Sequence, residues 1–206
     1  MTSITIVDYG MGNIGSLKNM FRRMGVETIV ASDPSAIKRA RKIVLPGVGA
    51  FGAAMEHIDS LGLREVLRAK AMVDKVPFLG ICLGMQLLTH FSEESPGVEG
   101  LGLIAGHAVK FPNVEGLKVP HMGWNELRIL RPTAVTSNLP EKPRFYFVHS
   151  YYVKATDPLD VNLSCHYGLD FDAGLNHKNI FGVQFHPEKS HKFGMALIKG
   201  FVEIQC

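Results

Sequence analysis

The sequence predicts an α/β fold: an open, mostly parallel, doubly wound sheet of the flavodoxin-like kind with an antiparallel extension. In the first half of the chain, short apolar runs alternate with stretches whose apolar residues recur at helical spacing. This alternation is typical of parallel strands joined by right-handed helical crossovers, with helices on both faces of the sheet. From about residue 105, strand-like runs follow one another across turns. That change favours antiparallel pairing in the second half.

Four strands are expected in the first half, at residues 4–8, 28–31, 42–45 and 78–81. The helix after the first strand carries apolar residues at helical spacing from Ile14 to Met24 and stops at Gly25. A second helix starts at Pro34 with Asp33 as its cap, because a cap acid followed by proline marks a helix start. Two further helical stretches are expected at residues 50–61 and 63–71.

The second half is expected to be rich in strands, at residues 107–111, 126–130, 144–153, 161–167 and 180–186, with turns such as 175–179 between them. A final helix is expected to start near Ser190 and to bury four apolar residues, namely Phe193, Leu197, Phe201 and Ile204. The chain shows no repeat, low-complexity tract or linker. We therefore expect residues 1–206 to form a single domain.

Composition excludes several classes of protein. The net charge is +3, from 22 basic and 19 acidic residues, and no basic run is present, so nucleic acid is not an expected partner. The three cysteines are an odd number without metal-ligand spacing, which predicts neither a disulfide framework nor a metal site. We find no signal-peptide core and no run of about 18 apolar residues. A cytoplasmic protein that does not enter the membrane is expected.

Cys82 stands in a setting typical of a catalytic nucleophile. It lies in Gly80-Ile81-Cys82-Leu83-Gly84, directly after an apolar strand and directly before an apolar helix. Glycines two residues before and after a nucleophile relieve crowding in a strained turn between a strand and a helix. The helix N-terminus would favour the thiolate, and the N–H of Leu83 would face an oxyanion. The alternative is a glycine-flanked strand end with a buried thiol.

A thiolate nucleophile also needs a proton donor and acceptor, and His186 is the best-placed histidine. It ends the apolar run 180–186 and is followed by Pro187 and Glu188. Residues i and i+2 of an extended segment point to the same side, so Glu188 is expected to orient His186. A surface turn is the alternative. With Cys82, these residues favour acyl transfer through a thioester with release of an amine.

Several segments resemble one known family. GICLGMQLL around Cys82 and QFHPEKS around His186 resemble the class I (triad) glutamine amidotransferases, over essentially the whole chain. PGVGAFGAAM at residues 46–55, PHMGWN at 120–125, FYFVHSYY at 145–152 and the opening IVDYGMGN resemble the glutaminase subunits of imidazole glycerol phosphate synthases. The resemblance implies the amidotransferase fold and a glutaminase that works without a cofactor.

The resemblance also implies the roles of individual residues. Cys82 would attack the side-chain carboxamide of glutamine. His186, oriented by Glu188, would protonate the departing ammonia and then activate water against the glutamyl thioester. The implied oxyanion hole and its loop comprise Leu83, Val48, Gly47 and Gly49, and the implied glutamine-binding residues are Gln86, Ser150 and Tyr151.

In this family ammonia passes to a separate partner, a (β/α)8-barrel cyclase subunit. There it would be used to make imidazole glycerol phosphate and aminoimidazole carboxamide ribotide, in a one-to-one complex serving histidine biosynthesis. Three residues, Tyr146, Trp124 and Lys189, match interface positions around the ammonia exit. A related glutaminase that feeds a different synthase, for example in surface-sugar amidation, stays open as an alternative.

Two readings from other classes compete with this one. Gly10, Gly12 and Gly15 form a literal G-x-G-x-x-G after a strand, and Asp33 follows where a ribose-binding acid would stand, so a dinucleotide-binding oxidoreductase fits the pattern. The short chain and the helix-capping position of Asp33 count against it. The other reading is an inactive scaffold subunit, although no catalytic position is visibly substituted.

Overall fold

The computed structural model describes residues 3–205. Its helices are α1 (Ile14–Arg23), α2 (Pro34–Lys38), α3 (Phe51–Ser60), α4 (Leu63–Met72), α5 (Leu83–Leu87) and α6 (His191–Val202), with short 3-10 turns η1 (Ala134–Thr136), η2 (Pro158–Asp160) and η3 (Pro187–Lys189). The strands are β1 (Ile4–Val7), β2 (Thr28–Ala31), β3 (Ile43–Gly47), β4 (Phe78–Cys82), β5 (Phe91–Ser92), β6 (Gly106–Lys110), β7 (His121–Ile129), β8 (Arg144–His149), β9 (Tyr151–Ala155), β10 (Val161–Tyr167), β11 (Leu169–His177) and β12 (Ile180–Val183).

The sheet confirms the predicted fold class. Its main path runs β2-β1-β3-β4-β12-β11-β10-β7-β8. The first five of these strands pair in parallel, and those beyond β12 pair antiparallel. Strand β12 therefore belongs to both halves, and its Val183 pairs with Ile81 of β4. This one strand carries the segment after residue 183 to the end of the sheet where Cys82 lies.

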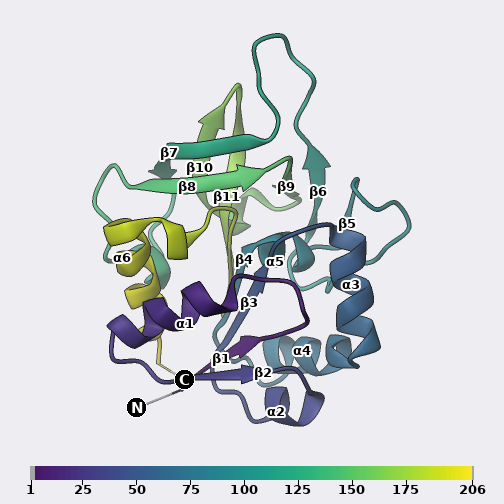
Figure 1. Cartoon of the computed structure of the whole chain (residues 1–206). Helices are drawn as coiled ribbons and strands as arrows, with labels where there is room; N and C mark the ends of the chain where they lie inside the picture. Colours follow the sequence, from purple (N-terminus) through teal and green to yellow (C-terminus); the bar gives the residue numbers. More distant parts are fainter. Residues whose placement is uncertain (1–2, 206) are drawn as a thin grey trace.

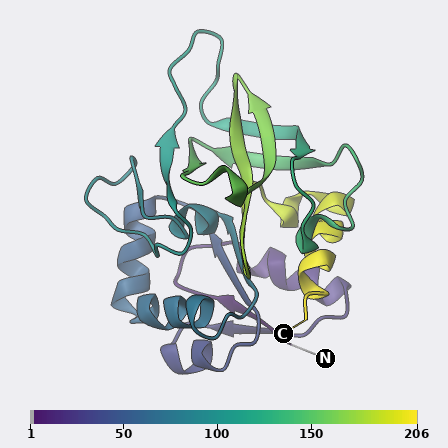
Figure 2. The same ribbon diagram turned by 180° about the vertical axis from the view of Figure 1, so that it is seen from behind.

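Helices cover both faces of the parallel half. In Figure 1, α1 and α6 lie together on one side of the strands, and α3 and α4 lie on the other; Figure 2 shows the same arrangement from behind. Neighbouring residues of β1 show why two separate cores form. Ile6 packs in the core that includes α1 and α6, whereas Val7 packs in the core that includes α3 and α4. Successive strand residues point to opposite faces, so an apolar run fills both layers.

Several predicted boundaries are correct. Strand β2 has the predicted bounds, and α1 is followed by Gly25 in the left-handed region at φ +69°. Asp33 caps α2, because its Oδ1 accepts a hydrogen bond from the N–H of Ala36 at 2.9 Å. Among residues 3–205, we find no helix with the length and apolar character that crossing a membrane demands.

The prediction was wrong in parts of the second half. The run 144–153 is two strands, because the chain leaves the β7 pairing after His149 and β9 pairs instead with β6 and β11. Residues 175–177, expected in a turn, continue β11 and pair with β12. Helix α6 ends at Val202, so Ile204 lies past it and is only partly buried. Phe193 is also only partly buried, whereas Leu197 and Phe201 are fully buried.

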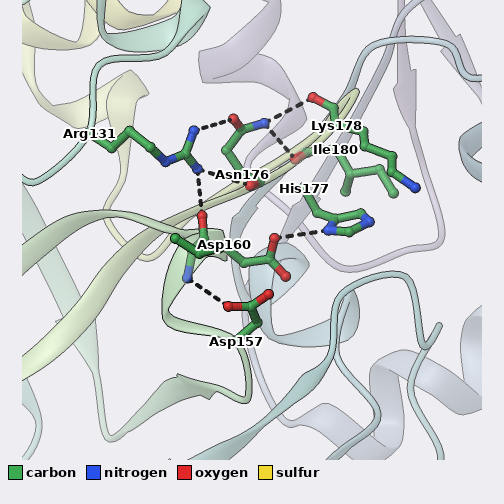
Figure 3. A network of polar contacts seen from close by, with 8 residues as sticks. Arg131, Asp157, Asp160, Asn176, His177, Lys178 and Ile180 are labelled. Carbon is green, nitrogen blue, oxygen red and sulfur yellow. Dashed lines mark hydrogen bonds and ion pairs between the residues drawn. The ribbon is translucent and has the colours of Figure 1, made fainter.

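A polar network closes the β11–β12 turn at the end of β12 far from Cys82 (Figure 3). Arg131 donates to the carbonyl of Leu159 at 2.8 Å and to Asn176, and Asn176 donates to the carbonyls of Lys178 and Ile180. His177 pairs with Asp160 at 2.9 Å. These contacts connect η2 to the turn and stabilise it.

Candidate active site

Cys82 lies at the carboxyl end of β4, where the chain turns sharply into α5. Its backbone has φ +56° and ψ −113°, a conformation that side-chain-bearing residues rarely adopt. The flanking glycines are required sterically, because a Cβ at position 84 would lie 1.9 Å from the carbonyl oxygen of Leu45. A Cβ at position 80 would lie 2.6 Å from the carbonyl oxygen of Gly84. Gly84 therefore lets the turn pack against β3, and Gly80 lets α5 start close to β4.

A pocket of about 320 Å³ opens over the sulfur. It is lined by residues that are distant in the sequence, namely Val48, Gly49, Cys82, Leu83, Gln86, Glu94, Pro120, Val148, His149, Ser150, Tyr151 and His186. The volume is at the lower end of the range for ligand pockets, which suits a single amino acid. The structure thus brings together eight of the residues predicted for nucleophile, base, oxyanion hole and glutamine binding.

His186 and Glu188 form a buried pair behind the pocket. His186 Nδ1 lies 2.8 Å from Glu188 Oε1, and each side chain is 2% exposed. The predicted contact is present, but the extended geometry predicted for it is wrong, since Pro187–Lys189 form the 3-10 turn η3. Ser190 holds this turn by donating to the carbonyl of His186 at 2.6 Å.

The electrostatics of the site favour a charged histidine. Burial opposes protonation of His186, but its interactions with Cys82 and Glu188 outweigh burial and raise its pKa to about 10. Nδ1 is occupied by Glu188, whereas the buried Nε2 has no hydrogen-bond partner among residues 3–205. The nitrogen left over is the one that a triad histidine uses for proton transfer.

The end of β3 and the loop after it, residues 46–49, form part of the pocket. Val48 and Gly49 line the pocket, and Gly49 adopts φ +108°. Gly47 lies beneath them as the last residue of β3, where a Cβ would be 2.6 Å from the Tyr9 hydroxyl and 2.8 Å from Leu83 Cβ. Gly47 therefore allows close packing under the loop, and the N–H groups of Val48 and Leu83 remain the predicted oxyanion donors.

Gln86, Ser150 and Tyr151 line the pocket, as glutamine-binding residues must. The amide nitrogen of Gln86 donates to the Tyr151 carbonyl at 3.0 Å and to Gln184 Oε1 at 3.2 Å. Both of its amide hydrogens are therefore engaged within the protein, which leaves the amide oxygen of Gln86 as the atom to meet a substrate.

Sequence reasoning missed Glu94, His149 and Gln184. Glu94 lines the pocket and accepts a hydrogen bond from the N–H of Phe51, at the start of α3, at 2.8 Å. Gln184 is fully buried and donates to Cys82 Sγ at 3.8 Å. Position gives the signal for Gln184, since it stands two residues before His186. Nothing local marks Glu94, whose place depends on a contact 43 residues distant.

Tyr146, Trp124 and Lys189 do not line the pocket, and both Trp124 and Lys189 contact Tyr146. Trp124 of β7 pairs in register with Tyr146 of β8, with their rings edge to face at 6.4 Å. Lys189 Nζ lies 5.7 Å from the centre of the Tyr146 ring, and Trp124 stacks on His191 at 5.6 Å. Trp124 stays 40% exposed, which suits a surface residue that meets a partner.

The G-x-G-x-x-G segment packs against the carboxyl end of β3 and against the loop that follows, where a Cβ on Gly49 would lie 2.6 Å from Met11 Cε. The Tyr9 hydroxyl donates to the carbonyl of Pro46 at 2.8 Å, and a Cβ on Gly12 would be 3.2 Å from the Pro46 ring. Asp33 is a helix cap, as described above. A dinucleotide-binding role is therefore not favoured. Within residues 3–205, no three His, Cys, Asp or Glu side chains are grouped as ligands of a metal ion.

The fold and the arrangement of the site are those of a class I glutamine amidotransferase. The profile of the family Glutamine amidotransferase class-I matches residues 5–204. A crystal structure of a glutamine amidotransferase superposes with a TM-score of 0.76 at 16% identity, covering 97% of each chain. That likeness concerns the fold.

Two relatives with assigned names show to which group of glutamine amidotransferases the chain belongs. Imidazole glycerol phosphate synthase subunit HisH 2 of Methanococcus maripaludis is 48% identical over 97% of this chain and 98% of its own length. The protein of the same name from Pseudomonas aeruginosa is 48% identical over 98% of this chain and 99% of its own. The chain belongs to the class-I glutamine amidotransferase family, and within it to the HisH subunits.

Proposed function

We propose that this chain is the glutaminase subunit of an imidazole glycerol phosphate synthase. The Cys82 thiolate attacks the side-chain carbonyl carbon of glutamine, and the N–H groups of Leu83 and Val48 stabilise the oxyanion. His186 gives its proton to the leaving nitrogen, which departs as ammonia and leaves a glutamyl thioester. His186 then takes a proton from water, the hydroxide attacks the thioester carbon, and glutamate leaves as the Cys82 sulfur is released.

One observation carries this proposal. Cys82 and His186 lie in one pocket after the neighbouring parallel strands β4 and β12, and Glu188 is bonded to the remote nitrogen of His186. Carboxyl ends of parallel strands meet at one edge of a sheet, which is where α/β proteins bind their ligands. Nucleophile, base and orienting acid are therefore arranged in space as acyl transfer needs.

The pocket also suits the polar end of glutamine. Glu94 and the amide oxygen of Gln86 both line it, and two acceptors of this kind attract an α-ammonium group. Ser150 and Tyr151 lie on the same wall at the junction of β8 and β9. We assign these four residues to substrate binding.

A surface beside the pocket is proposed to bind the cyclase. We call it the partner surface, and it comprises Met122, Trp124, Tyr146, Val148 and Lys189. Met122 pairs with Val148 and Trp124 with Tyr146 on neighbouring strands, and Val148 also lines the pocket. Met122 is 61% exposed. Exposed Met and aromatic side chains are favoured at interfaces. A (β/α)8-barrel subunit bound to this surface would adjoin the pocket, so ammonia would leave the pocket next to it.

The names of the relatives support imidazole glycerol phosphate synthase rather than another ammonia acceptor. We propose that residues 1–206 form one domain, because all strands of the described part belong to one sheet.

The proposal is tested by a glutaminase assay on the purified chain with and without a co-expressed barrel subunit. We expect hydrolysis of glutamine to rise when the partner is added.

Trp124→Ala should raise the Kd for the partner by about tenfold or more. Leu159→Ala, at an exposed residue of η2 outside the partner surface, is the matched control and should leave the Kd unchanged. Equal affinities for the two variants would contradict the partner surface.

A further inference from the structure

A chain of hydrogen bonds runs from β7 to the active-site pocket through two buried histidines. Asn125 Nδ2 lies 3.4 Å from His121 Nε2, and His121 Nδ1 lies 3.0 Å from His149 Nε2. His149 Nδ1 in turn lies 2.8 Å from the carbonyl oxygen of Tyr151. His121 and His149 are 2% and 6% exposed.

The two ends of the chain fix its direction. The Tyr151 carbonyl can only accept, so His149 must carry its proton on Nδ1, and its Nε2 must accept from His121 Nδ1. At the other end, Asn125 Oδ1 accepts from the N–H of Glu126 at 2.8 Å, which turns the amide nitrogen of Asn125 toward His121. Both ends therefore require the same pair of neutral histidine tautomers.

The chain continues from Tyr151 to the nucleophile. The Tyr151 carbonyl accepts a second hydrogen bond from Gln86 Nε2 at 3.0 Å, and that nitrogen also donates to Gln184 Oε1 at 3.2 Å. This contact turns the amide nitrogen of Gln184 toward Cys82, whose sulfur is 3.8 Å away. Each amide can have only one orientation, because a flipped amide would place two donors or two acceptors against each other.

We propose that Gln184 and His149 are positioning residues for Cys82, with the neutral His121–His149 pair holding the amide of Gln184 where it donates to the thiolate. The inference rests on the proposed glutaminase function and names groups that this function does not require. Gln184 contacts the nucleophile itself, and His149 acts through Tyr151 and Gln86.

The surroundings keep both histidines uncharged. Burial lowers the pKa of His121 to about 4 and that of His149 to about 3. The titratable groups facing His149 are His121 on β7 and His186 beyond β12, while Cys82 and Glu94 share its pocket. The rings of Phe111, Phe147 and Phe171 pack against it, with ring centres 5.2–5.6 Å away. A neutral His149 adds no positive charge beside the His186 imidazolium.

Three variants and one matched control test the inference. Gln184→Met keeps a similar volume but removes the donor to sulfur. His149→Phe removes both hydrogen bonds of His149. His149→Asn keeps a donor at the Nδ1 position and should therefore retain part of the reactivity of Cys82. His177→Asn is the matched control, because His177 is bonded to Asp160 in the network of Figure 3, far from Cys82.

The first readout is the alkylation rate of Cys82 by iodoacetamide across pH, measured by peptide-resolved mass spectrometry on the full chain. A hydrogen bond to a charged group is lost in Gln184→Met, and because a less stabilised thiolate is also more nucleophilic, alkylation at neutral pH should slow by about threefold rather than by the full tenfold. His149→Phe should slow it by a smaller factor and His149→Asn by less again. His177→Asn should react like the unaltered chain.

The second readout is glutamine hydrolysis in the complex with the barrel subunit. Gln184→Met and His149→Phe should lower kcat while the KM for glutamine changes less than about threefold, since the thiolate and not substrate binding is affected. If Gln184→Met does not fold, as judged by circular dichroism, the inference is tested by His149→Phe and His149→Asn alone. His149→Phe should then be the slower of the two in both readouts.

The outcomes separate the two proposals. In one outcome, the unaltered complex hydrolyses glutamine while the variants show the same alkylation rate and the same kcat as that complex. This result would overturn the positioning role and leave the proposed glutaminase function intact. An unaltered complex without any glutaminase activity would overturn the proposed function, whereas slower alkylation of Gln184→Met would still support the contact to Cys82.

Discussion

Glu188 accepts a hydrogen bond from Nδ1 of His186 at 2.8 Å while both side chains are almost fully buried. The pair leaves Nε2 of His186 as the only ring nitrogen available for proton transfer. A buried carboxylate of this kind fixes the tautomer and the orientation of a catalytic histidine. The central chemical prediction of the structure follows from this contact.

Glu188→Gln should lower both the pKa of His186 and the rate of glutamine hydrolysis. Glu188 and Cys82 together raise this pKa to about 10, and a neutral amide removes the charge of one of them. Proton transfer by a correctly oriented group contributes about 10²–10⁴-fold, so kcat should fall by about a hundredfold or more. The titration of His186 is followed by NMR. An unchanged titration and an unchanged kcat would contradict the role given to Glu188.

The raised pKa of His186, to which Cys82 and Glu188 both contribute, has a defined effect on stability. Because the folded pKa of His186 lies above its ordinary value of 6.5, the contribution to stability is complete below about pH 6.5. It is lost as the pH rises through about 10, where the folded protein releases the proton.

His121 and His149 should make the protein sensitive to acid in a different range of pH. Burial holds their folded pKa values near 4 and 3, below the ordinary 6.5. Below about pH 6.5 the unfolded chain binds protons that the folded protein excludes, so stability falls as the pH falls. The slope is at most about 1.4 kcal/mol per pH unit for each histidine.

Urea unfolding at about pH 7.5 and about pH 5 measures this effect. His121→Asn should unfold with a smaller difference in free energy between the two pH values than the unaltered chain. A difference as large as that of the unaltered chain would show that His121 is not kept neutral by the fold.

Two glycine substitutions separate the nucleophile turn from the G-x-G-x-x-G segment. Gly84→Ala places a Cβ 1.9 Å from the Leu45 carbonyl oxygen and should destabilise the protein by about 3 kcal/mol or more. At Gly15, an exposed residue of α1, a Cβ meets nothing within 4 Å. Gly15→Ala should be neutral or slightly stabilising and should leave glutaminase activity unchanged. Thermal unfolding compares the two, and a severe loss in Gly15→Ala would show that the segment has a role this structure does not explain.

The first half of the fold was predictable because its elements are fixed by local pattern. Each parallel strand is an apolar run, and Asp33-Pro34 marks its helix start unaided. The break after His149 was not predictable, because no glycine or proline stands there. The chain separates only because β8 and β9 have different neighbours in the sheet.

The site was predictable where neighbouring residues in the sequence carry the chemistry. The glycines around Cys82 and the short spacing from His186 to Glu188 are visible in the sequence. The contact of Gln184 with Cys82 joins residues 102 positions apart, and that of His121 with His149 joins residues 28 apart. Long-range contacts of this kind depend on strand order, which no local pattern encodes.

Cys82→Ala tests the central claim most directly. The variant is assayed in the reconstituted complex with the barrel subunit, first with glutamine and then with an added ammonium salt as the nitrogen source. Glutamine hydrolysis should be abolished because the nucleophile is gone, whereas synthesis from ammonium should continue at the rate of the unaltered complex. Glutaminase activity that survives in Cys82→Ala would contradict the assignment of Cys82 as the nucleophile.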